Sequence, residues 1–167
     1  MNTNKILVAI DDSDIAQRVV AYVAQMVRGK TGVHVRLFHI LPPLPPRLLE
    51  FPGTEDPQEE ARMNAELHAA QERWVKQAEQ DARPILENAR AKLLEAEMPA
   101  QAVEVHCTPS VGQHEVAALI LEAARASQCG MIVVGKDSYS RLTEFFHQHV
   151  GDKLQQKEHA FDIQVVE

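Results

Sequence analysis

Asp11, Ile40 and Gly135 each stand where a short apolar run ends, and their types suit the binding of a small polar molecule. A carboxylate such as that of Asp11 accepts hydrogen bonds from hydroxyl or N–H groups. A glycine such as Gly135 lets backbone N–H groups approach a phosphate closely. Ser138 adds a hydroxyl donor three positions later. The ends of these apolar runs are therefore where we expect any site for a small molecule.

Other residues that could do chemistry lack the spacing that the chemistry needs. His147 and His149 are two positions apart on an expected helix, so they point in different directions and do not form a metal pair. No Gly-x-Ser-x-Gly elbow and no Cys-x-x-Cys pair occurs. Cys107 and His106 are neighbours on an expected strand and face opposite sides, so they do not form a nucleophile–base pair. No positive support for an enzyme follows, and we expect no metal.

The elements that position these residues alternate between strand and helix. Apolar runs of strand length lie between helices whose apolar residues recur about every 3.6 positions. Such an alternation predicts a parallel α/β sheet covered on both faces, with any ligand beyond the carboxyl ends of the strands. Histidines in these strands (His34, His39 and His106) are expected to be buried and hydrogen-bonded. The expected strands are 5–10, 33–40, 102–107, 131–135 and 162–166, and the helix after the fourth strand covers 142–154.

One long insertion separates the second and third strands. Residues 41–57 hold six of the nine prolines and predict an extended loop, or, as an alternative, a proline-rich docking peptide. Residues 58–97 predict a helical segment, with a kink or a break into two helices at Pro84. Trp74 lies on its apolar stripe and is expected to anchor the core. The acidic stretch 55–60 is interpreted as a solvated helix start or, alternatively, as a partner surface.

Length, charge and cysteine content restrict the class of protein. The 167 residues predict one domain, 1–167. The net charge of −7 and the pI near 5.6 disfavour nucleic acid and anionic membranes as partners. No apolar run approaches the roughly 20 residues that a membrane span needs, and the first residues lack the apolar stretch of a signal peptide. Two cysteines are too few for a disulfide scaffold, so a cytoplasmic location is expected.

Three stretches together resemble the universal stress protein family. Ile6–Ser13 is similar to the opening strand and acidic turn of that family. His39 and Ile40, with the prolines after them, resemble the end of its second strand, and Met131–Gly135 resembles its fourth strand. The resemblance implies a single open, doubly wound sheet of five parallel strands in the order 3-2-1-4-5, with helices on both faces. It also implies a homodimer, for which the apolar final strand at 163–166 is the expected contact.

Family members that bind ATP carry Gly-x-x-Gly after the fourth strand and, nine residues later, Gly followed by Ser or Thr. In this sequence Gly135 holds the first of these positions, but Ser138 holds the second, and Gln148 and His149 hold the final pair. Side chains therefore stand where the backbone must approach phosphate. Asp11 remains where the ATP-binding members place the acid that contacts the nucleoside, although an acid there can also cap a helix. The candidate nucleotide-binding residues that the resemblance implies are therefore Asp11, Ile40, Gly135, Ser138 and His149.

The first hypothesis is a cytoplasmic universal stress protein that acts through contacts with unidentified proteins, without tight ATP binding and without a cofactor. The alternative is a diverged nucleotide-binding switch that holds ATP around Asp11, Ile40, Gly135 and Ser138, with weak ATP hydrolysis as an open possibility. A third class, a hydrolase or transferase that uses a histidine or cysteine, has no motif in its favour.

Overall fold

The strands of this chain form one parallel sheet. A computed structural model describes residues 2–11, 13–50, 53–110, 116–138, 140 and 161–167. The spatial order of the strands is β3-β2-β1-β4-β5, and every neighbouring pair is parallel. The predicted strand order is therefore confirmed. The strands are β1 (Asn2–Ile10), β2 (His34–Ile40), β3 (Val103–Thr108), β4 (Cys129–Gly135) and β5 (Asp162–Val166).

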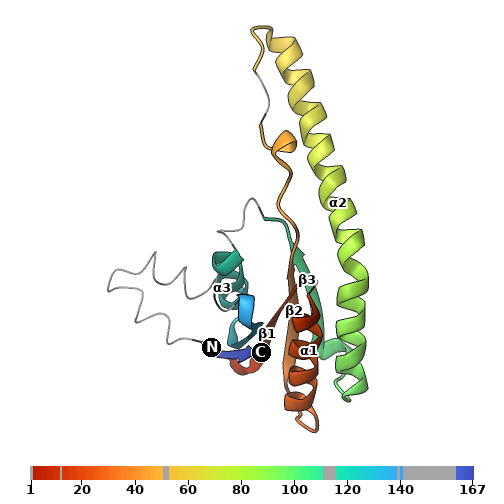
Figure 1. Ribbon diagram of the computed structural model, residues 1–167, viewed down its shortest axis with the longest axis vertical. Coiled ribbons are helices and arrows are strands. Elements are labelled where there is room, and N and C mark those ends of the chain that lie inside the picture. Colours follow the sequence, from red (N-terminus) through yellow and green to blue (C-terminus); the bar gives the residue numbers. More distant parts are fainter. Residues whose placement is uncertain (1, 12, 51–52, 111–115, 139, 141–160) are drawn as a thin grey trace, which may run out of the picture.

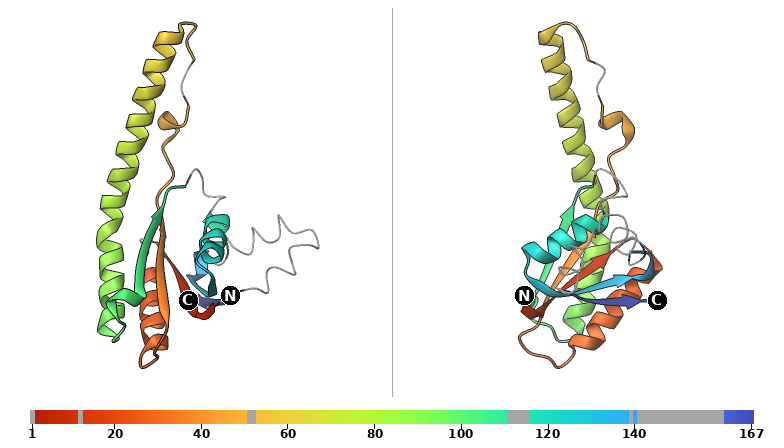
Figure 2. Two further views of the ribbon diagram at one scale, coloured as in Figure 1. Left: turned by 180° about the vertical axis from the view of Figure 1, so that it is seen from behind. Right: turned by 90° about the vertical axis from the view of Figure 1, so that its left-hand side faces the viewer.

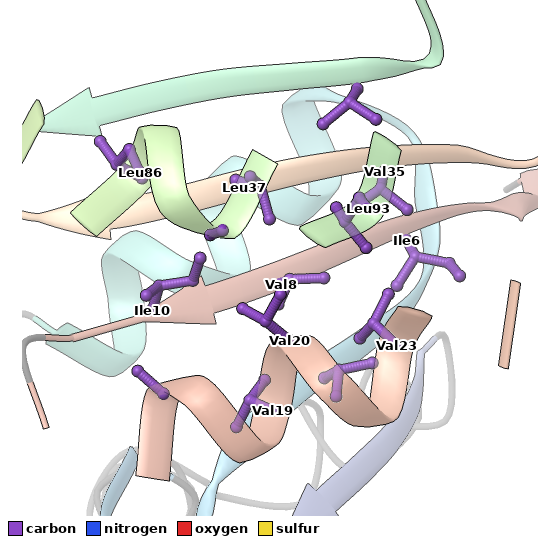
Figure 3. Packing of buried hydrophobic residues seen from close by; sticks show 14 of the residues in the cluster. Ile6, Val8, Ile10, Val19, Val20, Val23, Val35, Leu37, Leu86 and Leu93 are labelled. Carbon is purple, nitrogen blue, oxygen red and sulfur yellow. The ribbon is translucent and has the colours of Figure 1, made fainter. Parts of the chain in front are cut away.

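Helices cover both faces of the sheet, as predicted (Figures 1 and 2). One face packs against α1 (Asp14–Val27) and α2 (Pro57–Glu95), and the other against α3 (Val116–Ala126). Alternate residues of each strand feed the two cores, because successive side chains point to opposite faces. Figure 3 shows Val8 and Ile10 on the α1 and α2 side, whereas the neighbouring Leu7 belongs to the core under α3. The expected helix over 142–154 lies outside the described residues.

The helix α2 is much longer than the sheet needs. It has 39 residues, and its N-terminal half extends beyond the sheet beside the segment that follows β2 (Figures 1 and 2). That segment contains a short 3-10 helix, Pro46–Leu48, whose Leu48 carbonyl oxygen accepts a hydrogen bond from Gln71 Nε2 at 2.6 Å. Asp56 is the N-cap residue of this helix, and its Oδ1 accepts a hydrogen bond from the Gln58 N–H at 3.0 Å. Glu59 and Glu60 follow in the first turn, so the acidic stretch is a helix start.

Pro84 does not divide this helix. We expected a kink or a break into two helices at this position; the structure has one continuous α2, so the second of these alternatives, the break, is wrong. A proline inside a helix removes one N–H and leaves the carbonyl four residues earlier, here that of Gln80, without its helical partner. Gln80, Arg83 and Pro84 are all exposed, so water can hydrate that carbonyl. The opposite face, with the buried Leu86, holds the helix on the sheet.

We therefore expect Pro84→Ala to raise the free energy of unfolding by about 1–3 kcal/mol, because alanine supplies the missing N–H without the ring's clash. Urea denaturation of the full chain measures the change. Arg83→Ala, at the neighbouring exposed position, is the control and should stay within about 0.5 kcal/mol of the parent. A loss of stability in Pro84→Ala would show instead that the packing of α2 requires the local geometry of the proline.

Candidate functional site

A cavity of about 540 Å³ lies at the carboxyl edge of the sheet, where the sequence predicts a site. Its floor comes from the ends of β1 and β2. Its walls come from α2 on one side and from α3 on the other. The lining residues are Ala9, Ile10, Asp11, Ser13, Phe38, His39, Ile40, Leu41, Pro42, Pro43, Trp74, Gln77, Ala78, Asp81, Ala82, Ile85, Ser110, Val116, Ile120 and Ser138. The cavity is therefore mostly apolar, with a few polar groups, as small-molecule sites are.

Asp11 is held in place by the turn that leads into α1. Its Oδ1 accepts a hydrogen bond from the Ser13 N–H at 2.9 Å and another from the Ser13 hydroxyl. Ser13 is the first residue before the helix, but its side chain does not accept a hydrogen bond from the helix N–H groups. Asp11 thus orders the turn with one oxygen, and its Oδ2 has no partner among the described residues. The carboxylate is half-buried at the rim of the cavity.

His39 is the most deeply buried polar side chain of the sheet that faces the cavity, with 7% of its surface exposed. Its Nδ1 lies 2.8 Å from the carbonyl oxygen of Ile10. A carbonyl oxygen only accepts, so Nδ1 carries the hydrogen, and Nε2 of the neutral ring is an acceptor. Nε2 has no partner among the residues that the structure describes. Ser110, 4% exposed, also lines the cavity and donates to the Leu41 carbonyl oxygen at 3.4 Å.

The wall formed by α2 was not anticipated from the sequence. Trp74, Gln77, Asp81 and Ile85 line the cavity, and Gln77 Nε2 donates to Asp81 Oδ1 at 2.9 Å. Their spacing of three or four residues places them on one face of the helix, a signal that was available before the fold was known. Trp74 is half-buried between the core and the cavity, so it is both a core contact and part of the cavity wall.

The five candidate residues are not all placed together. Asp11, Ile40 and Ser138 line the cavity, whereas Gly135 does not. His149 lies outside the described residues. A Cβ built on Gly135 would stand 2.6 Å from Ile15 Cγ2, so α1 packs where a side chain would be. The close packing of α1 against Gly135 is enough to explain why this position has no side chain, and no bound phosphate is needed for that explanation.

The cavity also lacks positive side chains. Asp11 and Asp81 both line it, and no Lys or Arg is among the described residues of its lining. Lys136, just after β4, instead has its Nζ 3.9 Å from a carboxylate oxygen of Glu167. The local electrostatic potential of the described lining is therefore negative, which opposes the binding of a polyphosphate.

The remaining nucleophiles and histidines do not form a second site. His106 stacks on Phe38 on one face of the sheet, with ring centroids 5.8 Å apart, while Cys107 packs against the core of the other face. The prediction that they are not a pair is confirmed. Burial and, secondarily, the charge of Glu79 raise the pKa of the Cys107 thiol, which disfavours the reactive thiolate.

His34 and His106 are exposed, contrary to expectation. His34 is the first residue of β2, at the amino-terminal end of that strand, and His106 lies on β3, an edge strand of the sheet.

The described part of the chain holds neither a metal site nor a membrane-spanning helix. No group of three or more His, Cys, Asp or Glu side chains there is placed to hold a metal ion. No helix within the same residues has the length and apolar character needed to cross a membrane.

Comparison with known proteins identifies relatives. The sequence profile of the universal stress protein family matches residues 2–157. A crystal structure of a member of that family from Burkholderia pseudomallei is similar to this chain, with a TM-score of 0.61, 17% identity, and coverage of 98% of this chain and 96% of that one. A universal stress protein from Archaeoglobus fulgidus in complex with dAMP has a TM-score of 0.53 at 18% identity, covering 98% and 97%. One in complex with cAMP has a TM-score of 0.54 at 15% identity, covering 98% and 96%. No curated protein matches the sequence significantly.

The packing at Gly135 generates a stability prediction. Gly135→Ala should lower the free energy of unfolding by about 1–3 kcal/mol, because the new Cβ overlaps Ile15 Cγ2. Gly53→Ala is the control, since a Cβ there meets nothing within 4 Å, and it should change stability by less than about 0.5 kcal/mol. Ile15→Ala removes the overlapping methyl group, so the double variant should lose less stability than the two single losses together. A Gly135→Ala protein as stable as Gly53→Ala would contradict this explanation of the glycine.

Proposed function

Because this chain belongs to the universal stress protein family, we propose that it acts in the stress response through contacts with other proteins and does not bind ATP tightly. It works in the cytoplasm and has no catalytic activity of its own. The observation that carries the proposal is the charge of the cavity. Two carboxylates line it, and no lysine or arginine is among the described lining residues.

A polyphosphate is held in proteins by backbone N–H groups, by basic side chains or by a metal ion that offsets its charge. The departures from the ATP motif at Ser138 and Gln148 remove two glycines that allow close backbone approach, and His149 replaces the hydroxyl residue of the final pair. Asp11 and Asp81 add repulsion from the side of the sheet and from α2. Both effects act in the same direction, so the cost to ATP binding is larger than the loss of the motif alone.

The N-terminal half of α2 and the proline-rich segment beside it provide surface for protein contacts. Most of their side chains are exposed, and Leu49 is 41% exposed. An apolar hollow of about 620 Å³ lies where this segment meets α2, with Leu44 and Val75 in its lining. Exposed apolar groups with polar neighbours are the usual composition of protein-binding surfaces. We propose that this part of the molecule contacts the protein partners.

A homodimer through the C-terminal strand is the second part of the proposal. β5 lies at one edge of the sheet, with Val165 39% exposed. An edge strand presents unpaired N–H and C=O groups, and a two-fold axis allows the same strand of a second copy to pair with it. Burial of Val165 between the copies adds apolar contact to these hydrogen bonds.

The alternative is a diverged nucleotide-binding switch. It is favoured by the position of Asp11 and Ile40 in a cavity of ligand size and by the solved relatives that hold dAMP and cAMP. Such a switch would need the nucleoside part of the ligand to supply most of the affinity, because the described lining gives the phosphates no positive partner.

Calorimetric titration with Mg·ATP separates the two functions. We expect no binding tighter than about 100 μM for the parent protein, because the cavity repels the phosphates. The variant S138G/Q148G/H149S restores, together with Gly135, the complete glycine motif of the ATP-binding family members. Binding gained in that variant attributes the loss to the motif, and no gain attributes it to the carboxylates. Low-micromolar ATP binding by the parent would overturn the proposal in favour of the switch.

Sedimentation velocity at micromolar concentration tests the dimer. We expect a dimer for the parent and a monomer for Val165→Lys, because a lysine on the pairing edge introduces two like charges across the two-fold axis. Val105→Lys is the matched control on the opposite edge strand, β3, where Val105 is 43% exposed. It should remain a dimer. A monomeric parent, or a dimer disrupted only by Val105→Lys, would contradict the proposed contact.

A further inference from the structure

The part of the cavity next to α2 contains acceptors without donors. Only 7% of the surface of His39 is exposed, and its Nε2 has no hydrogen-bond partner among the described residues. A buried acceptor without a partner costs free energy, so the site favours a molecule that brings a donor. Two carboxylates face the same cavity. Asp11 uses Oδ1 for the Ser13 turn and Asp81 uses Oδ1 for Gln77, which leaves one oxygen of each available.

The apolar lining of the same cavity suits a flat ring. On the α2 side, Trp74 contributes aromatic surface and Ile85 aliphatic surface. An indole face also attracts a cation within about 6 Å of its centre, through the negative charge above the ring. The volume of about 540 Å³ is ample for a single small molecule.

We propose that this cavity binds a small aromatic amine in its protonated form. The ring packs against the apolar lining, and the ammonium group donates to His39 Nε2 and to the free oxygens of Asp11 and Asp81. A protonated amine is the chemistry that supplies both donors and positive charge, which are what the described lining lacks. This inference rests on the proposal above that the cavity does not hold a polyphosphate, and it assigns the cavity a ligand that the protein-contact function does not require.

Trp74 makes the binding directly observable, because it is the only tryptophan of the chain and it lines the cavity. The probe is benzylamine, titrated while Trp74 fluorescence is excited at its red edge, with calorimetry as a second readout of the same titration. Benzyl alcohol is the matched uncharged ligand. We expect a saturable fluorescence change with benzylamine and binding of benzyl alcohol weaker by about tenfold or more, because charged hydrogen bonds are the stronger ones.

Three variants test the residues named. His39→Asn keeps an N–H near the Ile10 carbonyl oxygen but removes Nε2, and Asp81→Asn removes one charge from an exposed position. Each should weaken benzylamine binding by about fivefold or more. Glu79→Gln is the control, because it removes one charge from the same helix at a position that lines a different hollow. It should leave the affinity within about twofold, since charges outside the cavity are screened by water and salt.

The outcomes are distinct. No saturable change in fluorescence and no heat with benzylamine would overturn the amine site, as would equal binding of benzyl alcohol or an equal loss in Glu79→Gln and Asp81→Asn. The same protein sample titrated with Mg·ATP reports on the proposed function separately. Failure of both ligands overturns the amine site and leaves the protein-contact function standing, whereas tight ATP binding overturns that function whatever benzylamine does.

Discussion

Burial of the central strands on both faces is the constraint on which the rest of this structure depends. Leu7 and Val8 of β1, and Ile132 and Val133 of β4, are adjacent pairs that point to opposite sides, and all four are 0% exposed. A strand of this kind is stable only when helices cover both faces of its sheet. Right-handed crossovers then bring every strand into the sheet in the same direction, so the carboxyl ends meet at one edge. The cavity lies at that edge because the helices leave it open.

The helix α2 connects this packing to the chemistry of the cavity. Ala78, Ala82 and Leu86 are buried on the face that lies against the rest of the fold. The adjoining side of the helix carries Trp74 and Asp81, which line the cavity. Packing thus fixes which side chains reach a ligand: rotation of the helix would expose the core residues and withdraw the wall together. A change of ligand chemistry in this fold therefore needs only substitutions on that face, with no change in the sheet.

The strands and the position of the site could be predicted because both follow from local patterns. Unbroken apolar runs marked β1 and β4, and the rule that ligands lie beyond the carboxyl ends of parallel strands located the cavity that contains Asp11 and Ile40. The role of Gly135 could not be read from the sequence, because the overlap with Ile15 depends on how closely α1 approaches β4. The exposure of His106 also depends on tertiary structure, since a strand's sequence does not state which of its faces a helix covers.

The contribution of α2 was missed for a related reason. A stripe at helical spacing predicts which side of a helix is apolar, but it does not reveal where along the helix the sheet ends and a cavity begins. Trp74, Ala78 and Ala82 all contribute to the core or pack against it and also line the cavity, so core and cavity wall overlap along this helix. Asp81 illustrates the same limit, because its charge is unremarkable on a solvated helix and matters only once the fold places it in the lining of the cavity that also contains Asp11.

The electrostatics of this edge follow from geometry more than from net charge. The chain as a whole carries −7, but a charge of that size spread over a surface is largely screened beyond about 10 Å in salt. The half-buried Asp11 and the exposed Asp81, which line one cavity, act on a ligand there over shorter distances, at which screening by salt is weaker. The fold provides a cavity at the ends of its strands, and side chains after β4 and on α2, such as Ser138 and Asp81, line it. In the function that we propose, the departures from the glycine motif and the two carboxylates act together, since each disfavours a ligand with phosphate.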